Sequence, residues 1–116
     1  MLESTSSARI VMTTVVSPEE AARLGRALVE ERLAACATML PSVQSIYHWK
    51  DQIECSAECL LLLKTACDRL PALEARLHEL HSYQTPEFLV LAVEAGSHPY
   101  LDWLDRSLRA PEGKVA

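Results

Sequence analysis

The amino-acid sequence predicts a mixed α+β domain with the element order β-α-β-β-α-β-α and one β-hairpin that is too long for the body of the domain. Two observations lead to this fold class. Short β-branched or alternating runs predict four strands, and apolar residues at three- and four-residue spacing predict three helices. The 116 residues are about half apolar, which suffices for a packed core. We expect one domain over residues 1–116, with an ordered core over about 9–108.

The chain opens with a strand and an amphipathic helix. Residues 9–15 (RIVMTTV) are rich in β-branched residues, which favours the first strand. Ser17 can cap the following helix, Pro18 suits its first position, and Glu20 completes a capping box. Apolar side chains then recur at helical spacing as far as Leu33, which predicts a helix with one buried face.

A long hairpin follows. Residues 35–49 are extended, and Pro41 with Ser42 predicts a bulge or bend within them. The tight turn at Lys50–Asp51 leads into strict alternation from Gln52 onward. This pattern indicates a second long strand, which is buried on one face at first and on both faces toward its end.

A second helix, a fourth strand and a third helix complete the order. Asp68 can cap the second helix, whose stripe of leucines ends at Leu80. Residues 88–93 are apolar on both faces, which predicts a central strand, and residues 100–108 form a short amphipathic helix. Two strand–helix–strand units joined by a hairpin make the ferredoxin-like plan, so we expect an α+β sandwich of this type.

The hairpin is longer than the domain that carries it. Each arm of about 14 residues could reach about 45 Å at roughly 3.3 Å per residue, whereas a compact domain of this size measures roughly 35 Å across. The distal part, residues 45–57, should therefore protrude. It carries side chains that are costly to expose together, namely Ile46, Tyr47, Trp49 and Ile53. We expect it to pack on a neighbouring copy of the chain; the alternative is a hairpin that curls back on its own sheet.

Composition excludes several classes of function. The formal net charge is -5, and eleven basic residues are scattered among sixteen acids, which argues against a nucleic-acid-binding surface. No stretch approaches the roughly 20 apolar residues of a membrane-spanning helix, and the first seven residues lack the pattern of a signal peptide. We therefore expect a cytoplasmic protein with loose ends at residues 1–7 and from Pro111. In that compartment the cysteines should be reduced thiols: Cys36, Cys55, Cys59 and Cys67.

Five short motifs occur in order along the chain. They are RLAACA at residues 32–37, Ser45-x-Tyr47-x-Trp49, Leu63-Lys64-Thr65, His81-x-Tyr83-x-x-Pro86-Glu87 and Tyr100-x-x-Trp103. At this spacing they resemble the CutA family of divalent-cation tolerance proteins over about residues 10–108. The resemblance implies a ferredoxin-like homotrimer whose long hairpins complete sheets between subunits, and an association with tolerance of copper and other divalent cations.

The resemblance also implies a set of metal ligands, of which this chain keeps one. Copper-binding members offer a cysteine on the first strand and two adjacent histidines at the end of the second helix, where this chain has Thr13, Leu80 and His81. If Cu(II) or another divalent cation binds, we expect His81 to hold it, with a dissociation constant on the order of ten micromolar or worse. Two other positions depart from the family. Asp51 stands where the family usually has glycine, and the hairpin turn should survive because aspartate tolerates the left-handed backbone conformation. Ser82 stands where the family usually has proline.

A second candidate site is a set of aromatic and charged residues within the motifs. Its members are Tyr47, Trp49, Lys64, Tyr83, Glu87 and Trp103. This set could bind a small anion or metabolite in a cleft between subunits, or it could build the trimer itself, with Lys64 and Glu87 as an ion pair.

Three functions are therefore open. They are a metal-tolerance or metal-response trimer, a small-ligand-sensing trimer by analogy with ferredoxin-like signalling trimers, and a scaffold. Catalysis is not expected, because no nucleophile–base–acid set and no glycine-rich phosphate loop occurs.

Overall fold

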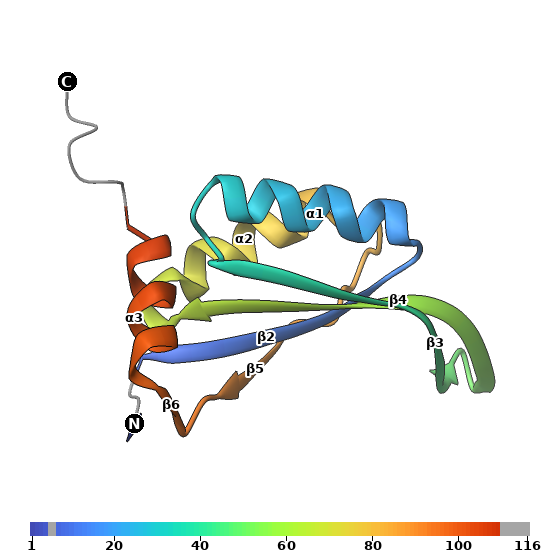
Figure 1. Ribbon diagram of the computed structural model, residues 1–116. Coiled ribbons are helices and arrows are strands. Elements are labelled where there is room, and N and C mark those ends of the chain that lie inside the picture. Colours follow the sequence, from blue (N-terminus) through green and yellow to red (C-terminus); the bar gives the residue numbers. More distant parts are fainter. Residues whose placement is uncertain (5–6, 110–116) are drawn as a thin grey trace.

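A four-stranded antiparallel sheet with two helices on one face forms the body of the computed structural model, which describes residues 1–4 and 7–109 (Figure 1). The sheet has the order β3-β4-β2-β5. Its strands are β2 (Ala8–Val15), β3 (Cys36–Trp49), β4 (Gln52–Ala66) and β5 (Leu89–Ala92). The covering helices are α1 (Pro18–Glu30) and α2 (Leu70–Leu80). This topology confirms the predicted α+β, ferredoxin-like plan. None of the described helices is long and apolar enough to cross a membrane.

A two-stranded sheet joins the start of the chain to its last third. β1 (Leu2–Ser4) pairs with β6 (Ala95–Ser97), so the prediction that residues 1–7 are loose is wrong for this strand. The residues of β1 carry no local pattern that predicts this strand. Its hydrogen-bond partners lie in β6, which is far away along the sequence and comes next to β1 only in the folded chain. α3 (His98–Ser107) follows β6 directly and packs across one end of the main sheet (Figure 1). The predicted loose tail from Pro111 lies outside the described residues.

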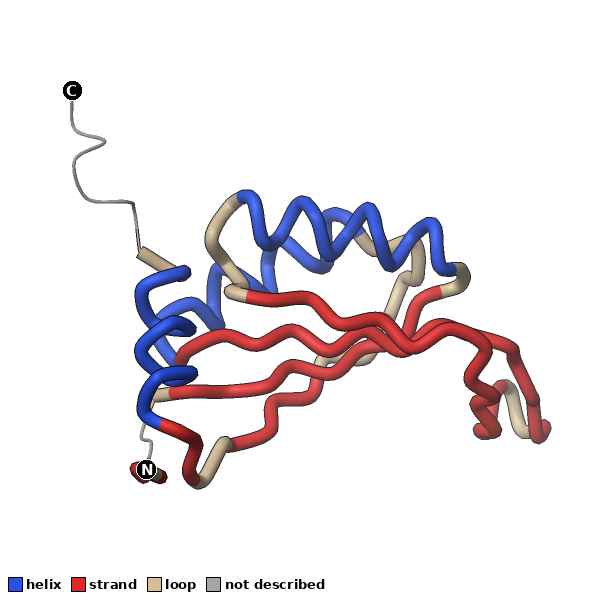
Figure 2. The backbone as a smooth tube through the Cα atoms, in the orientation of Figure 1, coloured by secondary structure: helices blue, strands red, loops and turns tan. Residues whose placement is uncertain are grey.

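The long hairpin has the bulge and the turn that the sequence predicts. The register between β3 and β4 shifts between Leu40 and Val43, and Ser42 takes a left-handed backbone conformation there, with φ of 62°. Lys50 and Asp51 are left-handed as well, as a two-residue hairpin turn requires. Beyond the bulge the ribbon bends and leaves the body of the domain (Figure 2). The molecule consequently measures 52 × 35 × 23 Å.

The core lies between one side of the sheet and the two helices. It consists of fully buried side chains from β2, β4, α1 and α2: Val11, Val15, Leu24, Leu28, Leu61, Leu63, Leu73 and Leu77. In the antiparallel register Val11 lies opposite Leu63, and both point toward the helices. The predicted helical stripes and the alternation along β4 therefore meet in one core.

The other side of the sheet carries a second apolar set, which α1 and α2 do not cover. We call it the open sheet face and define it by Ile10, Met12, Leu40, Leu60, Leu62, Leu89 and Leu91. Leu89 and Leu91 are 53% and 46% exposed. Leu60 and Leu62, which we expected to be buried, are only half buried in the single chain. Contiguous apolar surface of this kind marks an interaction site.

β5 occupies a different place from the one predicted. Its apolar residues on both faces suggested a central strand, but the sheet order puts it at an edge. Val90 points toward the helices, while Leu89 and Leu91 belong to the open sheet face. Both faces of β5 are therefore apolar although the strand has a neighbour on one side only. The sequence pattern alone cannot distinguish such an edge strand from a central one.

The start of the second helix also differs from the prediction. A 3₁₀ turn over Cys67–Arg69 precedes α2, and the helix has no side-chain N-cap. Asp68 lies within that turn, and its carboxylate accepts a hydrogen bond of 2.7 Å from Arg109. The aspartate thus holds the segment after α3 and does not cap α2.

Replacement by valine is expected to have opposite effects at two buried threonines of the sheet. Thr13 and Thr65 are both fully buried, but the Thr13 hydroxyl has no hydrogen-bond partner among the described residues, whereas that of Thr65 donates to the Leu33 carbonyl at 2.8 Å. Thr13→Val should stabilise the protein by about 1 kcal/mol, because it removes an unpaired buried hydroxyl. Thr65→Val should destabilise it by about 1–3 kcal/mol, because it leaves the carbonyl unpaired. Urea unfolding measures both, and a destabilised Thr13→Val would contradict the assignment.

Candidate functional site

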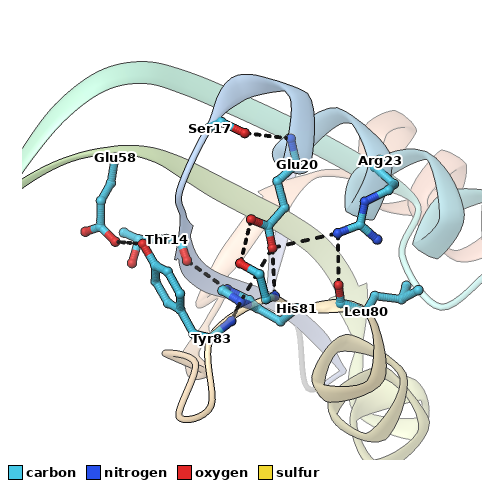
Figure 3. A network of polar contacts seen from close by, with 9 residues as sticks. Thr14, Ser17, Glu20, Arg23, Glu58, Leu80, His81 and Tyr83 are labelled. Atoms are coloured by element: carbon cyan, nitrogen blue, oxygen red, sulfur yellow. Dashed lines mark hydrogen bonds and ion pairs between the residues drawn. The ribbon is translucent and has the colours of Figure 1, made fainter.

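The imidazole of His81 lies at the centre of a polar network where α2 ends (Figure 3). The side chain is fully buried. Nε2 lies 2.9 Å from the Thr14 carbonyl oxygen, and Nδ1 accepts the Tyr83 backbone N–H at 3.0 Å. Because a carbonyl can only accept, Nε2 carries the proton, and the ring is the neutral Nε2–H tautomer.

Glu20 connects α1 to the segment after α2. Its carboxylate accepts hydrogen bonds from the backbone N–H and the hydroxyl of Ser82, both at 2.8 Å. Arg23 and His81 each lie 3.8 Å from the same carboxylate. Burial works against ionisation, but the two hydrogen bonds from Ser82, with the charge of Arg23, outweigh it and lower the pKa of Glu20. The predicted capping box is half right, since the Ser17 hydroxyl accepts the Glu20 N–H while the Glu20 side chain bonds Ser82.

Replacing Glu20 by glutamine should change how stability depends on pH. A carboxyl whose pKa is lower in the folded than in the unfolded chain stabilises the fold above its unfolded pKa, and that contribution is lost as the pH falls through the folded pKa. Glu20→Gln should therefore cost about 1–2 kcal/mol at neutral pH and flatten the loss of stability below about pH 4.5. Unfolding free energies from pH 3 to 7 test this, with the exposed neighbour Glu19→Gln as the control. Equal pH profiles for the two variants would contradict the assignment.

Tyr83 extends the network to the base of the hairpin. Its hydroxyl donates to the Glu58 carboxylate of β4 at 2.6 Å (Figure 3). Burial and this hydrogen bond raise the pKa of Tyr83, and Tyr47 lies near enough to add to the effect. Burial and the charge of Glu58 raise the pKa of Glu87, so Glu87 lies within electrostatic range of the same carboxylate. The base of the hairpin therefore gathers hydroxyl and carboxyl groups.

The six residues of the predicted cluster fall into three places within one chain. Tyr83 and Glu87 lie at the base of the hairpin, whereas Tyr47 and Trp49 belong to its distal part, with Tyr47 near enough to Tyr83 to affect its pKa and Trp49 57% exposed. Lys64 lies toward the opposite end of the sheet, where it contacts α3, the helix that carries Trp103. A site that includes all six would need more than one copy of the chain.

Lys64 has an aromatic partner in α3. Its ammonium donates to the Tyr100 hydroxyl at 3.2 Å and lies 5.4 Å from the centre of that ring. The hydrogen bond raises the pKa of Lys64. Tyr100 in turn contacts Trp103, with 5.4 Å between the ring centres. The ion pair considered for Lys64 and Glu87 does not form among the described residues; the polar partner of the Lys64 ammonium is the Tyr100 hydroxyl.

Sequence reasoning missed three members of the network. By pattern alone, Glu58 is a polar position in an alternating strand, Glu20 is part of a helix cap, and Ser82 is a departure from a family motif. One signal could have singled out Glu58: it is the last polar residue of β4 before apolar residues occupy both faces of the strand.

No group of three or more histidine, cysteine, aspartate or glutamate side chains in residues 1–4 and 7–109 is arranged to hold a metal ion. Thr13 and Leu80 lie at the positions where the resemblance implies ligands. Thr13 is fully buried, and Leu80 packs against the core cluster. The role of His81 as a ligand stays a prediction, and both of its ring nitrogens are engaged by backbone groups.

Comparison with known proteins finds consistent similarity over most of the chain. The family model described as CutA1 divalent ion tolerance protein matches residues 9–107. The divalent-cation tolerance protein CutA of Thermus thermophilus is 44% identical over 95 residues, which are 82% of this chain and 92% of that protein. CutA from Synechococcus elongatus superposes with a TM-score of 0.91 at 40% identity, covering 94% of this chain and 96% of that one.

Two further solved structures bear on ligands and location. One is the same Synechococcus protein complexed with a Bis-Tris molecule, with a TM-score of 0.86, 40% identity and coverage of 92% and 99%. The other is described as the periplasmic divalent cation tolerance protein CutA of Archaeoglobus fulgidus, with a TM-score of 0.85, 30% identity and coverage of 88% and 99%.

Proposed function

Because this chain belongs to the CutA1 divalent ion tolerance family, we propose that it acts in the tolerance of divalent cations, copper among them, as a homotrimer. The observation that carries the assembly is the exposure of apolar surface in two places. The open sheet face is one. The distal hairpin is the other, with Ile46, Trp49 and Ile53 between 57% and 72% exposed. Burial of both surfaces against neighbouring copies would remove them from water.

Cation association with this chain is expected to be weak, on the order of ten micromolar or worse. Thr13 and Leu80 supply no adequate ligand, and the His81 lone pair is already in use. The trimer is therefore proposed to act in the response to divalent cations without a tight resident metal site. No chemical step is assigned to it.

Growth in copper tests the proposal. The chain should restore growth at raised Cu²⁺ concentrations to a bacterium whose own gene of this family is deleted. The matched control is a folded but unassembled variant, Leu91→Glu, which should fail to restore it. A wild-type chain that accumulates as a trimer and leaves copper sensitivity unchanged would refute the function and keep the assembly.

A small-ligand trimer is the second candidate, and one observation favours it. A relative 40% identical to this chain has been solved with Bis-Tris, a hydroxylated amine. The hydroxyl and carboxyl groups of Tyr47, Glu58, Tyr83 and Glu87 would suit such a molecule. Bis-Tris should then raise the melting temperature of the wild type more than that of Glu58→Gln. Equal shifts would remove the support.

The cytoplasmic location also remains a proposal. The Archaeoglobus relative is described as periplasmic, which makes the periplasm the alternative location to test. Fractionation of cells that express the untagged chain tests it. Recovery with periplasmic markers would refute it.

A further inference from the structure

The His81 imidazole completes backbone hydrogen bonding at the point where the sheet loses a strand. The ladder between β2 and β5 ends at Met12, which pairs with Leu89. Thr14 lies two residues farther along β2, and its carbonyl oxygen receives the Nε2–H of His81 at 2.9 Å. The ring thus supplies a donor where β5 no longer can, so the carbonyl of the half-buried Thr14 keeps a hydrogen-bond partner.

The other ring nitrogen holds the following turn. Nδ1 accepts the N–H of Tyr83 at 3.0 Å, and the two rings contact each other with their centres 4.8 Å apart. Tyr83 held in this way reaches the Glu58 carboxylate with its hydroxyl at 2.6 Å. Glu58 lies in β4 opposite Val43, directly beyond the bulge where the hairpin leaves the body.

A metal ion would need one of the two ring nitrogens. Coordination through Nε2 would remove the proton that the Thr14 carbonyl accepts, and coordination through Nδ1 would displace the Tyr83 N–H. Either would leave a backbone group of a half-buried residue without its partner, which opposes binding. A cation also has no direct access, because the side chain is 0% exposed.

We propose that His81 is a positioning residue and not a metal ligand: its neutral ring joins Thr14 to Tyr83 and so sets the Tyr83 hydroxyl on Glu58 at the base of the hairpin. This role goes beyond the proposed tolerance function and does not need the trimer, since all four residues belong to one chain. His81 thereby acts on the hairpin through Tyr83.

Two substitutions separate a positioning role from a ligand role. His81→Ala removes both hydrogen bonds. His81→Asn keeps an acceptor for the Tyr83 N–H, because an asparagine side chain bonds the backbone two residues on, but it removes the imidazole. Amide hydrogen exchange at Tyr83 followed by NMR, and calorimetric titration with Cu²⁺ alone, are measured on both variants and the wild type.

Protection of the Tyr83 amide should fall at least about tenfold in His81→Ala and stay within about threefold of wild type in His81→Asn. Copper affinity, or its absence, should be the same in all three proteins. A tenfold or larger loss of copper affinity in both variants would overturn the assignment, as would full Tyr83 protection in His81→Ala. If His81→Ala does not fold, the test rests on His81→Asn. The proposal then requires that this variant keep a protected Tyr83 amide and an unchanged copper affinity, and failure of either result overturns it. Neither measurement depends on copper tolerance in cells, so failure here and failure of the proposed function are distinguishable.

Discussion

Replacement of Leu91 by glutamate is expected to convert the proposed homotrimer into a folded monomer. Leu91 is 46% exposed in the single chain and lies opposite Ile10 on the open sheet face. Assembly through this face would bury one unpaired carboxylate from each chain, and each costs several kcal/mol in an apolar interface. The monomer gains no such charge in its core, because the opposite side of the sheet packs on the helices. Light scattering should show a fall from about three times the 12.9 kDa chain mass to the chain mass itself.

Val29→Glu is the matched control. Val29 is similarly apolar and 37% exposed, but it lies on α1, on the other side of the sheet. This variant should remain a trimer at micromolar concentration. A wild type that is monomeric while folded would refute the assembly outright. A Leu91→Glu variant that remains trimeric would place the contact on the hairpin alone.

Replacement of Leu61 by alanine is expected to cost about 2–5 kcal/mol of unfolding free energy. Leu61 is fully buried between the sheet and the helices, and α1 approaches the adjacent strand β3 closely at Gly25, where an added Cβ would lie 2.9 Å from the Ala37 Cβ. The close approach of helix and strand leaves little room for the core to collapse into the space. Urea unfolding at fixed protein concentration measures the loss through the shift in midpoint.

Leu62→Ala, the next residue along β4, is the control. Leu62 points to the open sheet face, so its truncation removes little from the core of a single chain. In the monomeric Leu91→Glu background, Leu62→Ala should cost about 1 kcal/mol or less, while Leu61→Ala should keep its full effect. Equal costs in that background would mean that the two faces of β4 are not divided as described.

The elements with local signals can be predicted from the amino-acid sequence alone. The alternation along β4 assigns Leu61 and Leu63 to one face, because successive side chains of a strand point to opposite sides. Pro41 with Ser42 marks the bulge, and Lys50–Asp51 marks the turn, because these residues suit the backbone conformations found there. The length of the hairpin follows by arithmetic from the strand rise.

Which distant groups meet depends on the folded chain. Folding puts β5 at an edge and pairs β1 with β6, choices that depend on neighbours and not on each strand's own pattern. It brings the Glu20 carboxylate to Ser82, 62 residues away, and both nitrogens of His81 to backbone groups. The sequence identifies His81 as an imidazole with ligand chemistry. Whether the lone pair of His81 is free to bind a metal depends on the hydrogen-bond donors that folding brings within about 3 Å of it. A local sequence pattern does not determine which donors these are.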